Sequence, residues 1–314
     1  MNRQKTVYVA GHNGMVGSAI VRKLTDEGYR IITRSSKELD LTNQQAVNQF
    51  FSNVSPDYVF LAAAKVGGIY ANSMYPADFI YKNTMIQTNV INAAYLYGVK
   101  KLMFLGSSCI YPKFATQPIK ESELLTGALE PSNEAYALAK ISGLRMCAFY
   151  RQQYGCDFIS AMPTNLFGIN DNFHPENSHV LPALLNRFHK AKLNGDKEVT
   201  VWGTGSPLRE FQYVDDLADA LFFIMNNYSE EEHINCGSGE EISIRDLVYT
   251  IKNVVGYEGD VIWDETKPDG TPRKLMDSSK LHSLGWEQKI GMTEGLKRTY
   301  KWYLENVDLD TFKS

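Results

Sequence analysis

The stretch VYVAGHNGMVGSAI, residues 7–20, joins an apolar run to an amphipathic segment through a loop that is rich in glycine. Residues 6–10 have the composition of a buried strand, and in residues 15–27 the apolar side chains recur at helical spacing. The glycines of the loop are Gly11, Gly14 and Gly17. Glycines at a strand-to-helix turn let the backbone approach a pyrophosphate, and free N–H groups at the start of the helix bind the anion. The stretch therefore predicts a dinucleotide-binding loop.

The first half of the chain alternates short apolar runs with longer segments of helical periodicity. The apolar runs are residues 6–10, 30–33, 57–62, 102–105 and 158–162. Such alternation is typical of βαβ units and of a parallel sheet whose strands are buried on both faces. After residue 165 the sequence changes to loops rich in Gly, Pro and Asn, with isolated helices such as 180–193 and 217–225. We predict an α/β fold with a Rossmann-type doubly wound parallel sheet in residues 1–165. A smaller C-terminal α/β substrate lobe is expected in residues 166–314, with some segments returning to the first domain.

Charge and cysteine content exclude several classes of function. The 32 Lys and Arg and the 36 Asp and Glu residues give a net charge of −4 and include no basic run, so nucleic acid is not expected as a partner. No apolar stretch reaches the ~18 residues of a membrane span. The four cysteines lie far apart, without the spacing of a metal site or of a disulfide framework. We expect a soluble cytoplasmic protein without a metal.

The end of the second apolar run bears on the choice of dinucleotide. An acidic residue there would bind the ribose 2′-hydroxyl of NAD, whereas an arginine can bind the 2′-phosphate of NADP. The run ends in Thr-Arg-Ser-Ser-Lys, residues 33–37, with no acidic residue among them. This favours NADP(H), with Arg34 as the main phosphate ligand and Lys37 as a weaker one. Asp40 would bind the adenine amino group or would cap the helix that begins at Asn43.

The stretch NEAYALAK, residues 133–140, places Tyr136 and Lys140 one helical turn apart on the same face. A tyrosine with its ordinary pKa of about 10 is a poor acid or base at neutral pH, and a neighbouring ammonium group lowers that pKa. Upstream, GSSCIYPK, residues 106–113, begins where a buried run ends, and its Ser107 supplies a hydroxyl that can hold a substrate oxygen. The ordered combination of glycine loop, serine and Tyr-x-x-x-Lys predicts a site for carbonyl reduction.

Longer strings make the chain similar to a known family. They are GHNGMVGSAI, LAAAKVGGI, NSMYPADFIY, FLGSSCIYPK, MPTNLFG, DNFHPENSHVLPALL, WGTGSPLREF and KPDGTPRK. On these strings the chain resembles the extended short-chain dehydrogenase/reductase family over nearly its whole length, and within it the GDP-L-fucose synthases. The resemblance implies an NADPH-dependent conversion of GDP-4-keto-6-deoxy-mannose by epimerisation at C3 and C5 and reduction at C4.

The resemblance also implies roles for individual side chains. Ser107 and Tyr136 would hold the C4 oxygen while the neighbouring carbons lose protons, and Tyr136 would later protonate that oxygen. Cys109 would be the base and His179 the acid of the epimerisation, with His174 as a rival for the acid. The lysine of the Tyr-x-x-x-Lys pair and a histidine would lower the pKa of the thiol.

The cofactor residues implied by the resemblance lie in the glycine loop, at the ends of the apolar runs and beside the catalytic pair. They are Gly11, Asn13, Gly14, Met15, Val16, Gly17, Arg34, Asp40, Leu41, Leu61, Ala62, Ala63, Lys140, Pro163, Asn165, Leu166 and His179. The chain departs from some family members at Asn13, where they have an arginine near the 2′-phosphate.

A nucleotide diphosphate brings about two negative charges, which paired guanidinium groups bind efficiently. Arg187 and Arg209 are the ligands implied by the resemblance. Trp202 would cover the nucleotide or the sugar, and Asp269 would bind a ribose or base edge. Ser107 and Ser108 complete the substrate set, Ser108 as a hydroxyl that anchors the backbone.

The same resemblance implies a homodimer, formed by helices at about 81–96 and 136–149. Ile86, Val90, Ala93 and Ala94 form a small apolar face that suits helix packing, although the same face can lie on the sheet.

Two alternatives to this function remain open: another sugar-nucleotide 4-epimerase or 4-reductase of the same fold, and a non-catalytic NADP-binding regulator. A dehydratase is disfavoured, because that class has Thr-Asp-Glu where this chain has Ser107-Ser108-Cys109. Regulators related to such reductases tend to lose the tyrosine or the lysine, and this chain has both.

Overall fold

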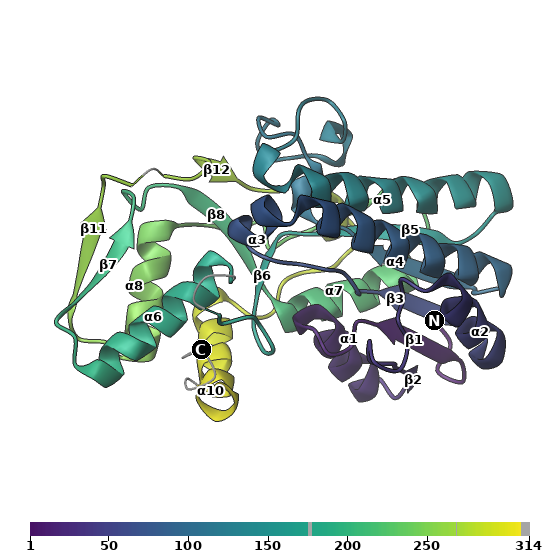
Figure 1. Ribbon diagram of the computed structural model, residues 1–314, viewed down its shortest axis with the longest axis horizontal. Helices are drawn as coiled ribbons and strands as arrows, with labels where there is room; N and C mark the ends of the chain where they lie inside the picture. Colours follow the sequence, from purple (N-terminus) through teal and green to yellow (C-terminus); the bar gives the residue numbers. More distant parts are fainter. Residues whose placement is uncertain (175–177, 268, 309–314) are drawn as a thin grey trace.

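The computed structural model describes residues 1–174, 178–267 and 269–308, and its centre is a six-stranded sheet (Figure 1). The strand order is β2, β1, β3, β4, β5, β9, and all neighbouring strands are parallel. These strands are β1 (Thr6–Ala10), β2 (Arg30–Ile32), β3 (Tyr58–Leu61), β4 (Lys101–Leu105), β5 (Phe158–Pro163) and β9 (Ile234–Cys236). Each apolar run of the first half is a strand, and the predicted doubly wound α/β fold is confirmed.

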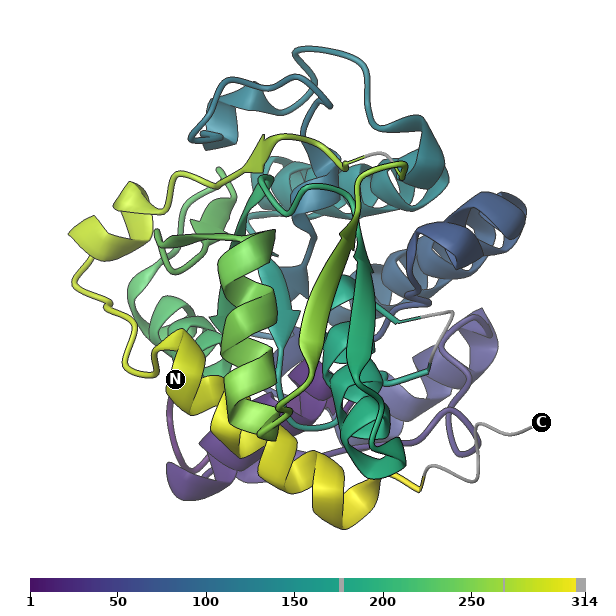
Figure 2. The same ribbon diagram turned by 90° about the vertical axis from the view of Figure 1, so that its left-hand side faces the viewer.

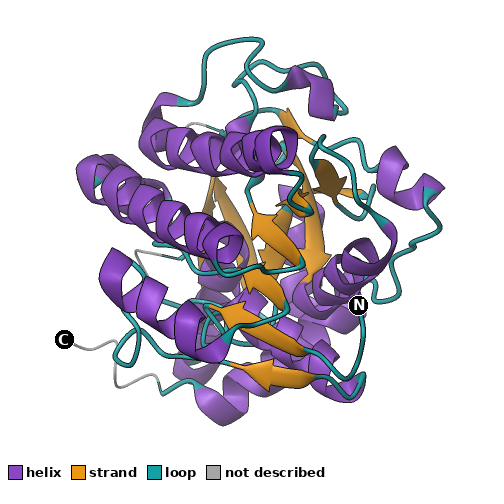
Figure 3. Cartoon of the chain, turned by 90° about the vertical axis from the view of Figure 1, so that its right-hand side faces the viewer, coloured by secondary structure: helices purple, strands orange, loops and turns teal. Residues whose placement is uncertain are grey.

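Helices cover both faces of this sheet (Figures 1 and 3). On one face α1 (Met15–Asp26) packs against α7 (Val214–Asn227). The other face is covered by α2 (Gln44–Val54), α4 (Pro76–Leu96) and α5 (Glu134–Tyr154). Both layers bury apolar strand residues, which is why the strands are apolar throughout rather than alternating.

The sides of β1 illustrate this double burial. Val7 and Val9 belong to the core that includes α1 and α7, whereas Tyr8 and Ala10 belong to the core that includes α2 and α4. All four side chains are buried. Alternate residues of a strand point to opposite faces, so both sets need apolar side chains.

The apolar face of α4 that was expected at a dimer interface lies inside the protein. Val90, Ala93 and Ala94 are fully buried in the core above the sheet, and Ile86 packs against it. The alternative placement, with the face on the core, is therefore the correct one, and these residues cannot meet a second subunit. The outer surface of the α4 and α5 pair shows other side chains.

Local residues set the starts of two helices. The Asn43 side chain accepts the Ala46 N–H at 3.1 Å and caps α2. Asp40, the cap considered from the sequence, instead accepts the N–H and the hydroxyl of Thr42 at 2.9 and 2.8 Å. Pro76 begins α4, a position where the missing N–H costs no hydrogen bond.

The second part of the structure, called the lobe below, is built on β8 (Leu208–Tyr213). β8 pairs with β10 (Glu241–Ser243) in antiparallel fashion and with β6 (Asn165–Phe167) and β12 (Arg273–Lys274) in parallel. A separate parallel pair joins β7 (Glu198–Trp202) and β11 (Asp260–Asp264). The helices α6 (Val180–Asn194), α8 (Ile244–Val255) and α10 (Met292–Asn306) pack around these strands (Figure 2).

Short elements complete the described chain. They are α3 (Ile69–Met74), α9 (Ser279–Ser283) and the 3₁₀ turns η1 (Ser108–Ile110), η2 (Glu121–Glu123) and η3 (Pro131–Asn133). Beyond residue 165, α7 and β9 return to the central sheet, where β9 pairs with β5. None of the helices in the described ranges has both the length and the apolar character needed to cross a lipid bilayer.

Candidate active site

The glycine loop after β1 is shaped by close backbone contacts. Gly11 has φ +87°, and a Cβ atom there would lie 2.7 Å from the Ala63 nitrogen. A Cβ atom on Gly17 would lie 2.1 Å from the Gly11 carbonyl oxygen, so the first turn of α1 leaves no room for a side chain. At Gly14 the nearest atom would be 3.5 Å away. Close approach therefore requires glycine at 11 and 17 but not at 14.

The start of α1 suits an anion. Gly14 is the N-cap, and within the described residues no side chain caps the first turn. Met15 and Val16 are partly buried, and Asn13 is exposed in the loop. The Nδ1 atom of His12 is buried without a hydrogen-bond partner among the described residues. Because free N–H groups and the helix dipole attract phosphate, this cradle fits the pyrophosphate of NADP(H).

Arg34 lies exposed directly after β2. Its guanidinium group is 5.6 Å from the centre of the Phe50 ring, and Nη1 donates to the Thr33 carbonyl oxygen at 2.7 Å. These contacts hold the cation at the strand end where a dinucleotide on the loop places its ribose. Lys37 is exposed nearby in the chain, and Leu41 packs against the core.

The chain turns sharply where β4 ends. Ser107 is the N-cap of η1, and its Oγ accepts the Cys109 N–H at 3.4 Å. Ser107 is partly buried, whereas Ser108 and Cys109 are buried. A Cβ atom on Gly106 would lie 2.1 Å from the Met162 sulfur, so the turn passes close to β5. The turn places these polar side chains at the carboxyl end of a parallel sheet, where α/β folds form ligand sites.

The helix α5 brings Tyr136 and Lys140 to this strand end. The Lys140 ammonium donates to the Leu105 carbonyl oxygen at 2.7 Å and lies 5.7 Å from the centre of the Tyr136 ring. Burial lowers the pKa of Lys140 to about 8 and raises the pKa of Tyr136. The expectation that Lys140 lowers the tyrosine pKa is not met here, because burial, and then the neighbouring Cys109, raise that pKa. Tyr136 therefore keeps its proton at neutral pH.

Burial also raises the pKa of the Cys109 thiol, while a hydrogen bond from Ser107 and the charges of Lys274 and Lys140 act against that rise. Lys140 acts in the expected direction. The second cation is Lys274 rather than the histidine that was expected. In this structure the thiol is protonated at neutral pH, so a base at this position needs further stabilisation of its thiolate.

His179 is the N-cap of α6, and its side chain is exposed. Desolvation by the surrounding protein, and then the charge of Lys274, lower the pKa of its imidazole. His174, the rival acid, is partly buried in the preceding loop, where its N–H donates to Asn172 Oδ1 at 3.0 Å. Residues 175–177 of the same motif lie outside the described residues.

Lys274 is the site residue that sequence reasoning missed. It lies in β12, and its charge acts to lower the pKa of both the Cys109 thiol and the His179 imidazole. Sequence reasoning selected only Asp269 from the KPDGTPRK stretch. The basic pair Arg273-Lys274 at the end of that stretch could have identified Lys274 as a further candidate. Pro268 of this stretch lies outside the described residues.

The lobe contributes two arginines to the substrate set. Arg187 on α6 donates to the Thr200 carbonyl oxygen at 2.9 Å, and Arg209 on β8 donates to the Leu208 carbonyl oxygen at 2.8 Å. Arg209 stands opposite Lys274 in the register of β8 and β12. Burial, and to a smaller extent the charge of Arg209, lower the pKa of Lys274. The structure thus forms a basic pair from two strands that are far apart in sequence.

Trp202 and Asp269 lie at the end of β7. Trp202 is 67% exposed, and Lys267 Nζ is 5.7 Å from the centre of its ring. The Asp269 carboxylate accepts the N–H of Thr204 at 3.0 Å and its hydroxyl at 2.7 Å. Asp269 therefore holds the turn beside Trp202, whose exposed ring is suited to stacking.

The remaining expected cofactor residues lie at the ends of neighbouring strands. Ala62 donates its N–H to the Ala10 carbonyl oxygen at 3.0 Å, and the preceding residue, Leu61, is buried. Pro163 ends β5, and Asn165 Nδ2 donates to the Glu210 carbonyl oxygen at 2.9 Å. Leu166 follows in β6. These residues thus lie at the ends of β3 and β5 and in β6, which pairs with β8.

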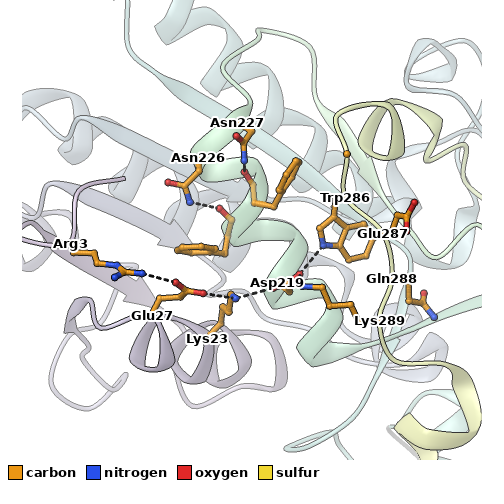
Figure 4. A pocket seen from close by; sticks show the side chains of 13 residues that line it. Arg3, Lys23, Glu27, Asp219, Asn226, Asn227, Trp286, Glu287, Gln288 and Lys289 are labelled. Carbon is orange, nitrogen blue, oxygen red and sulfur yellow. Dashed lines mark hydrogen bonds and ion pairs between the residues drawn. The ribbon is translucent and has the colours of Figure 1, made fainter.

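A cavity of about 690 Å³ lies elsewhere, beside α1 and α7 (Figure 4). Most of its charged side chains pair with one another: Glu27 pairs with Arg3 at 3.1 Å and with Lys23 at 2.8 Å. Asp219 pairs with Lys23 at 2.9 Å and with Lys289 at 2.7 Å. None of the expected site residues lines this cavity.

Comparisons with known proteins agree with this arrangement. The model of the NAD dependent epimerase/dehydratase family matches residues 7–237. GDP-L-fucose synthase 1 of Arabidopsis thaliana is 64% identical over 98% of this chain and 95% of that protein. A GDP-6-OMe-4-keto-L-xylo-heptose reductase from C. jejuni has a TM-score of 0.92, is 40% identical and covers 98% of this chain and 99% of its own. A GDP-L-fucose synthetase from Naegleria fowleri bound to NADP has a TM-score of 0.90, is 32% identical and covers 98% of this chain and 96% of its own.

Proposed function

The chain belongs to the NAD dependent epimerase/dehydratase family, and we propose that it converts GDP-4-keto-6-deoxy-mannose to GDP-L-fucose with NADPH. The main support is the 64% identity to a GDP-L-fucose synthase over 98% of the chain. The protein is an NADP-dependent enzyme that acts on a GDP-sugar, and the reaction combines epimerisation at C3 and C5 with reduction at C4.

The epimerisation is assigned to the turn after β4 and to the start of α6. The C4 ketone acidifies the hydrogens at C3 and C5, and the hydroxyls of Ser107 and Tyr136 stabilise the enolate oxygen that forms. Cys109 takes the proton as its thiolate, and His179 returns one to the opposite face. Burial raises the thiol pKa, and the charges of Lys274 and Lys140 act against that rise and favour the thiolate.

The reduction is assigned to the pair on α5. NADPH, held by the glycine loop and Arg34, would provide the hydride that C4 receives. Tyr136, which burial keeps protonated, donates its proton to the C4 oxygen, and the Lys140 ammonium then stabilises the phenolate. The glycine cradle holds the pyrophosphate, and Arg34 binds the 2′-phosphate by a charge-assisted contact.

Binding of the GDP moiety is assigned to the lobe. Arg187, Arg209 and the additional Lys274 neutralise the diphosphate, which has about two negative charges. The exposed ring of Trp202 stacks on the nucleotide or the sugar. Asp269 fixes the turn next to that ring and is placed to share its carboxylate with a ribose hydroxyl.

We further propose a homodimer formed by the outer faces of α4 and α5. The two helices pack side by side, and their exposed apolar side chains include Tyr81, Leu138 and Phe149, which are 62%, 43% and 49% exposed. These residues replace the buried stripe that the sequence had suggested. Phe149→Glu should give a monomer in a sedimentation measurement at micromolar concentration, and a wild-type monomer would refute the dimer.

The four cysteines are free, which suits the reducing cytoplasm that we propose as the compartment.

The activity is tested by incubating the protein with GDP-4-keto-6-deoxy-mannose and NADPH, following the loss of NADPH absorbance and identifying the sugar by NMR. GDP-L-fucose is the expected product. A 6-deoxy sugar without inversion at C3 and C5 would show a plain 4-reductase. Tightly retained NAD without net reduction would show a 4-epimerase.

A further inference from the structure

Glu210 in β8 is a completely buried acidic residue next to Arg209. Its Oε1 accepts the Gly239 N–H at 2.9 Å and the Ser238 hydroxyl at 3.4 Å, and its Oε2 accepts the Met276 N–H at 3.2 Å. Burying a carboxylate is costly unless its oxygens are hydrogen-bonded. Here both oxygens are used, and each joins β8 to a different segment of the chain.

The Met276 contact lies two residues beyond Lys274. β12 runs parallel to β8 over only Arg273 and Lys274, with Lys274 opposite Arg209. Two residues are a short strand, so the register of β12 depends on contacts at its ends. The bond from the Met276 N–H to Glu210 Oε2 is one such contact, and it ties the chain after Lys274 to β8. The same segment is also bonded to residues 117–119 through Leu275 and Asp277.

The backbone of Glu210 is tied to the other side of the site. Its carbonyl oxygen accepts Asn165 Nδ2 at 2.9 Å, and Asn165 begins β6 at the expected nicotinamide wall. The chain at Gly237 passes so close that a Cβ atom there would lie 2.2 Å from Glu210 Oε1. Neither the carboxylate nor its surroundings has room to shift.

We propose that Glu210 is a positioning residue that holds Lys274 in register with Arg209, so that both cations meet the diphosphate of the substrate. The inference rests on the proposed function. Glutamine has nearly the same shape as glutamate, but its amide offers one oxygen acceptor and one NH₂ donor. In Glu210→Gln one oxygen contact must be lost, and an NH₂ group then faces an N–H donor. With one of the contacts between β8 and the chain after Lys274 lost, Lys274 is aligned less closely with Arg209, and the diphosphate loses part of its charge-assisted binding.

The test measures the Kd of GDP and of NADPH by calorimetry in the full chain. Glu210→Gln should weaken GDP binding about tenfold, the expected size for one charge-assisted contact, and should change NADPH binding less than twofold. The KM of the GDP-sugar should rise by a similar factor. The rate of the reduction step, which is assigned to Tyr136 and Lys140, should change little, whereas proton exchange at C3 and C5 should slow, because the charge of Lys274 also acts on the Cys109 thiol. Ser238→Ala is the matched control, since it removes a contact to the other carboxylate oxygen, away from β12, and should leave the Kd of GDP unchanged.

A double variant tests whether Glu210 acts through Lys274. Lys274→Ala and the double variant Glu210→Gln/Lys274→Ala should bind GDP equally weakly, because the register no longer matters once the cation is gone. Multiplied losses in the double variant, or wild-type GDP binding in Glu210→Gln, would overturn the proposal. Glu210→Asp, which keeps the charge but is one methylene shorter, serves as a second variant. If neither Glu210→Gln nor Glu210→Asp folds, the role of Glu210 is structural and the proposal is also wrong. A wild-type protein that does not bind GDP would instead contradict the proposed function.

Discussion

The strand-end site, with Ser107, Cys109, Tyr136 and Lys140, differs in burial from the outer part of the lobe site, with Arg187 and Trp202. At the end of β4, Lys140 is 4% and Cys109 is 8% exposed, and burial shifts the pKa of both. In the lobe, Trp202 is 67% exposed, and Arg187 is also exposed. The two arginines of the lobe, Arg187 and Arg209, each donate a hydrogen bond to a backbone carbonyl oxygen. We therefore expect the strand-end site to determine which groups can give or take a proton, and the lobe site to bind the charged substrate.

This difference separates chemistry from affinity. Substitutions at the strand end should change kcat, because we propose that the buried groups there transfer protons. Substitutions in the lobe or in the cofactor cradle should change binding with smaller effects on the chemical step. A strand-end variant that affected only binding, or a lobe variant that abolished turnover at saturating substrate, would break the distinction.

The largest effect is expected for Tyr136→Phe. The variant keeps the packing of the ring but removes the proton donor, so kcat for NADPH oxidation should fall by roughly 10²- to 10⁴-fold. NADPH binding and the melting temperature should stay close to those of the wild type. Wild-type NADPH consumption would refute the assignment of Tyr136 as the acid.

Gly17→Ala should weaken NADPH binding by roughly 10- to 100-fold, because the new methyl group would overlap the Gly11 carbonyl oxygen at 2.1 Å. Gly14→Ala is the matched control, since its Cβ atom meets nothing closer than 3.5 Å. Fluorescence titration with NADPH measures both Kd values. Equal losses in the two variants would show that the cradle is not shaped as described.

Arg34→Ala should remove a preference for NADPH over NADH of about tenfold, or about 1.4 kcal/mol, which is the size of a charge-assisted contact. The ratio of kcat/KM for the two coenzymes measures it. An unchanged ratio would place the 2′-phosphate ligand elsewhere, with Lys37 as the next residue to substitute.

The smallest effect concerns pH. Burial lowers the pKa of Lys140 to about 8, so the ammonium form is lost as the pH rises through that value, and kcat at pH 8 should be about half its value at pH 7. Between pH 8 and the ordinary lysine value of 10.5 the unfolded chain binds more protons than the folded chain. The free energy of unfolding should therefore rise with pH in that window, relative to Lys140→Met. A flat difference between the two proteins would contradict the lowered pKa.

Much of the first region was predictable because its residues are close in sequence. The glycine loop, the serine after β4 and the Tyr-x-x-x-Lys pair each lie within one turn or one loop, where spacing alone fixes the geometry. The inward face of α4 was ambiguous, because a small apolar stripe suits either the sheet or a second subunit.

The second region was predicted less completely because its geometry comes from tertiary contacts. Lys274 reaches the site only because β12 pairs with β8, and a two-residue strand leaves no pattern in the sequence. The sign of the tyrosine pKa shift was also wrong, because spacing shows a neighbouring charge but not how much water burial removes.

The central claim is that Cys109 is the base of the epimerisation, and exchange of substrate hydrogens with solvent deuterium tests it most directly. Cys109→Ser replaces a thiol by an alcohol that yields little anion at neutral pH, so exchange at C3 and C5 should be lost. Ser107, Tyr136 and Lys140 remain, and the variant should slowly reduce the unepimerised ketone. Exchange at both carbons at the wild-type rate in Cys109→Ser would contradict the claim and transfer the role to another group, first to His179 or His174.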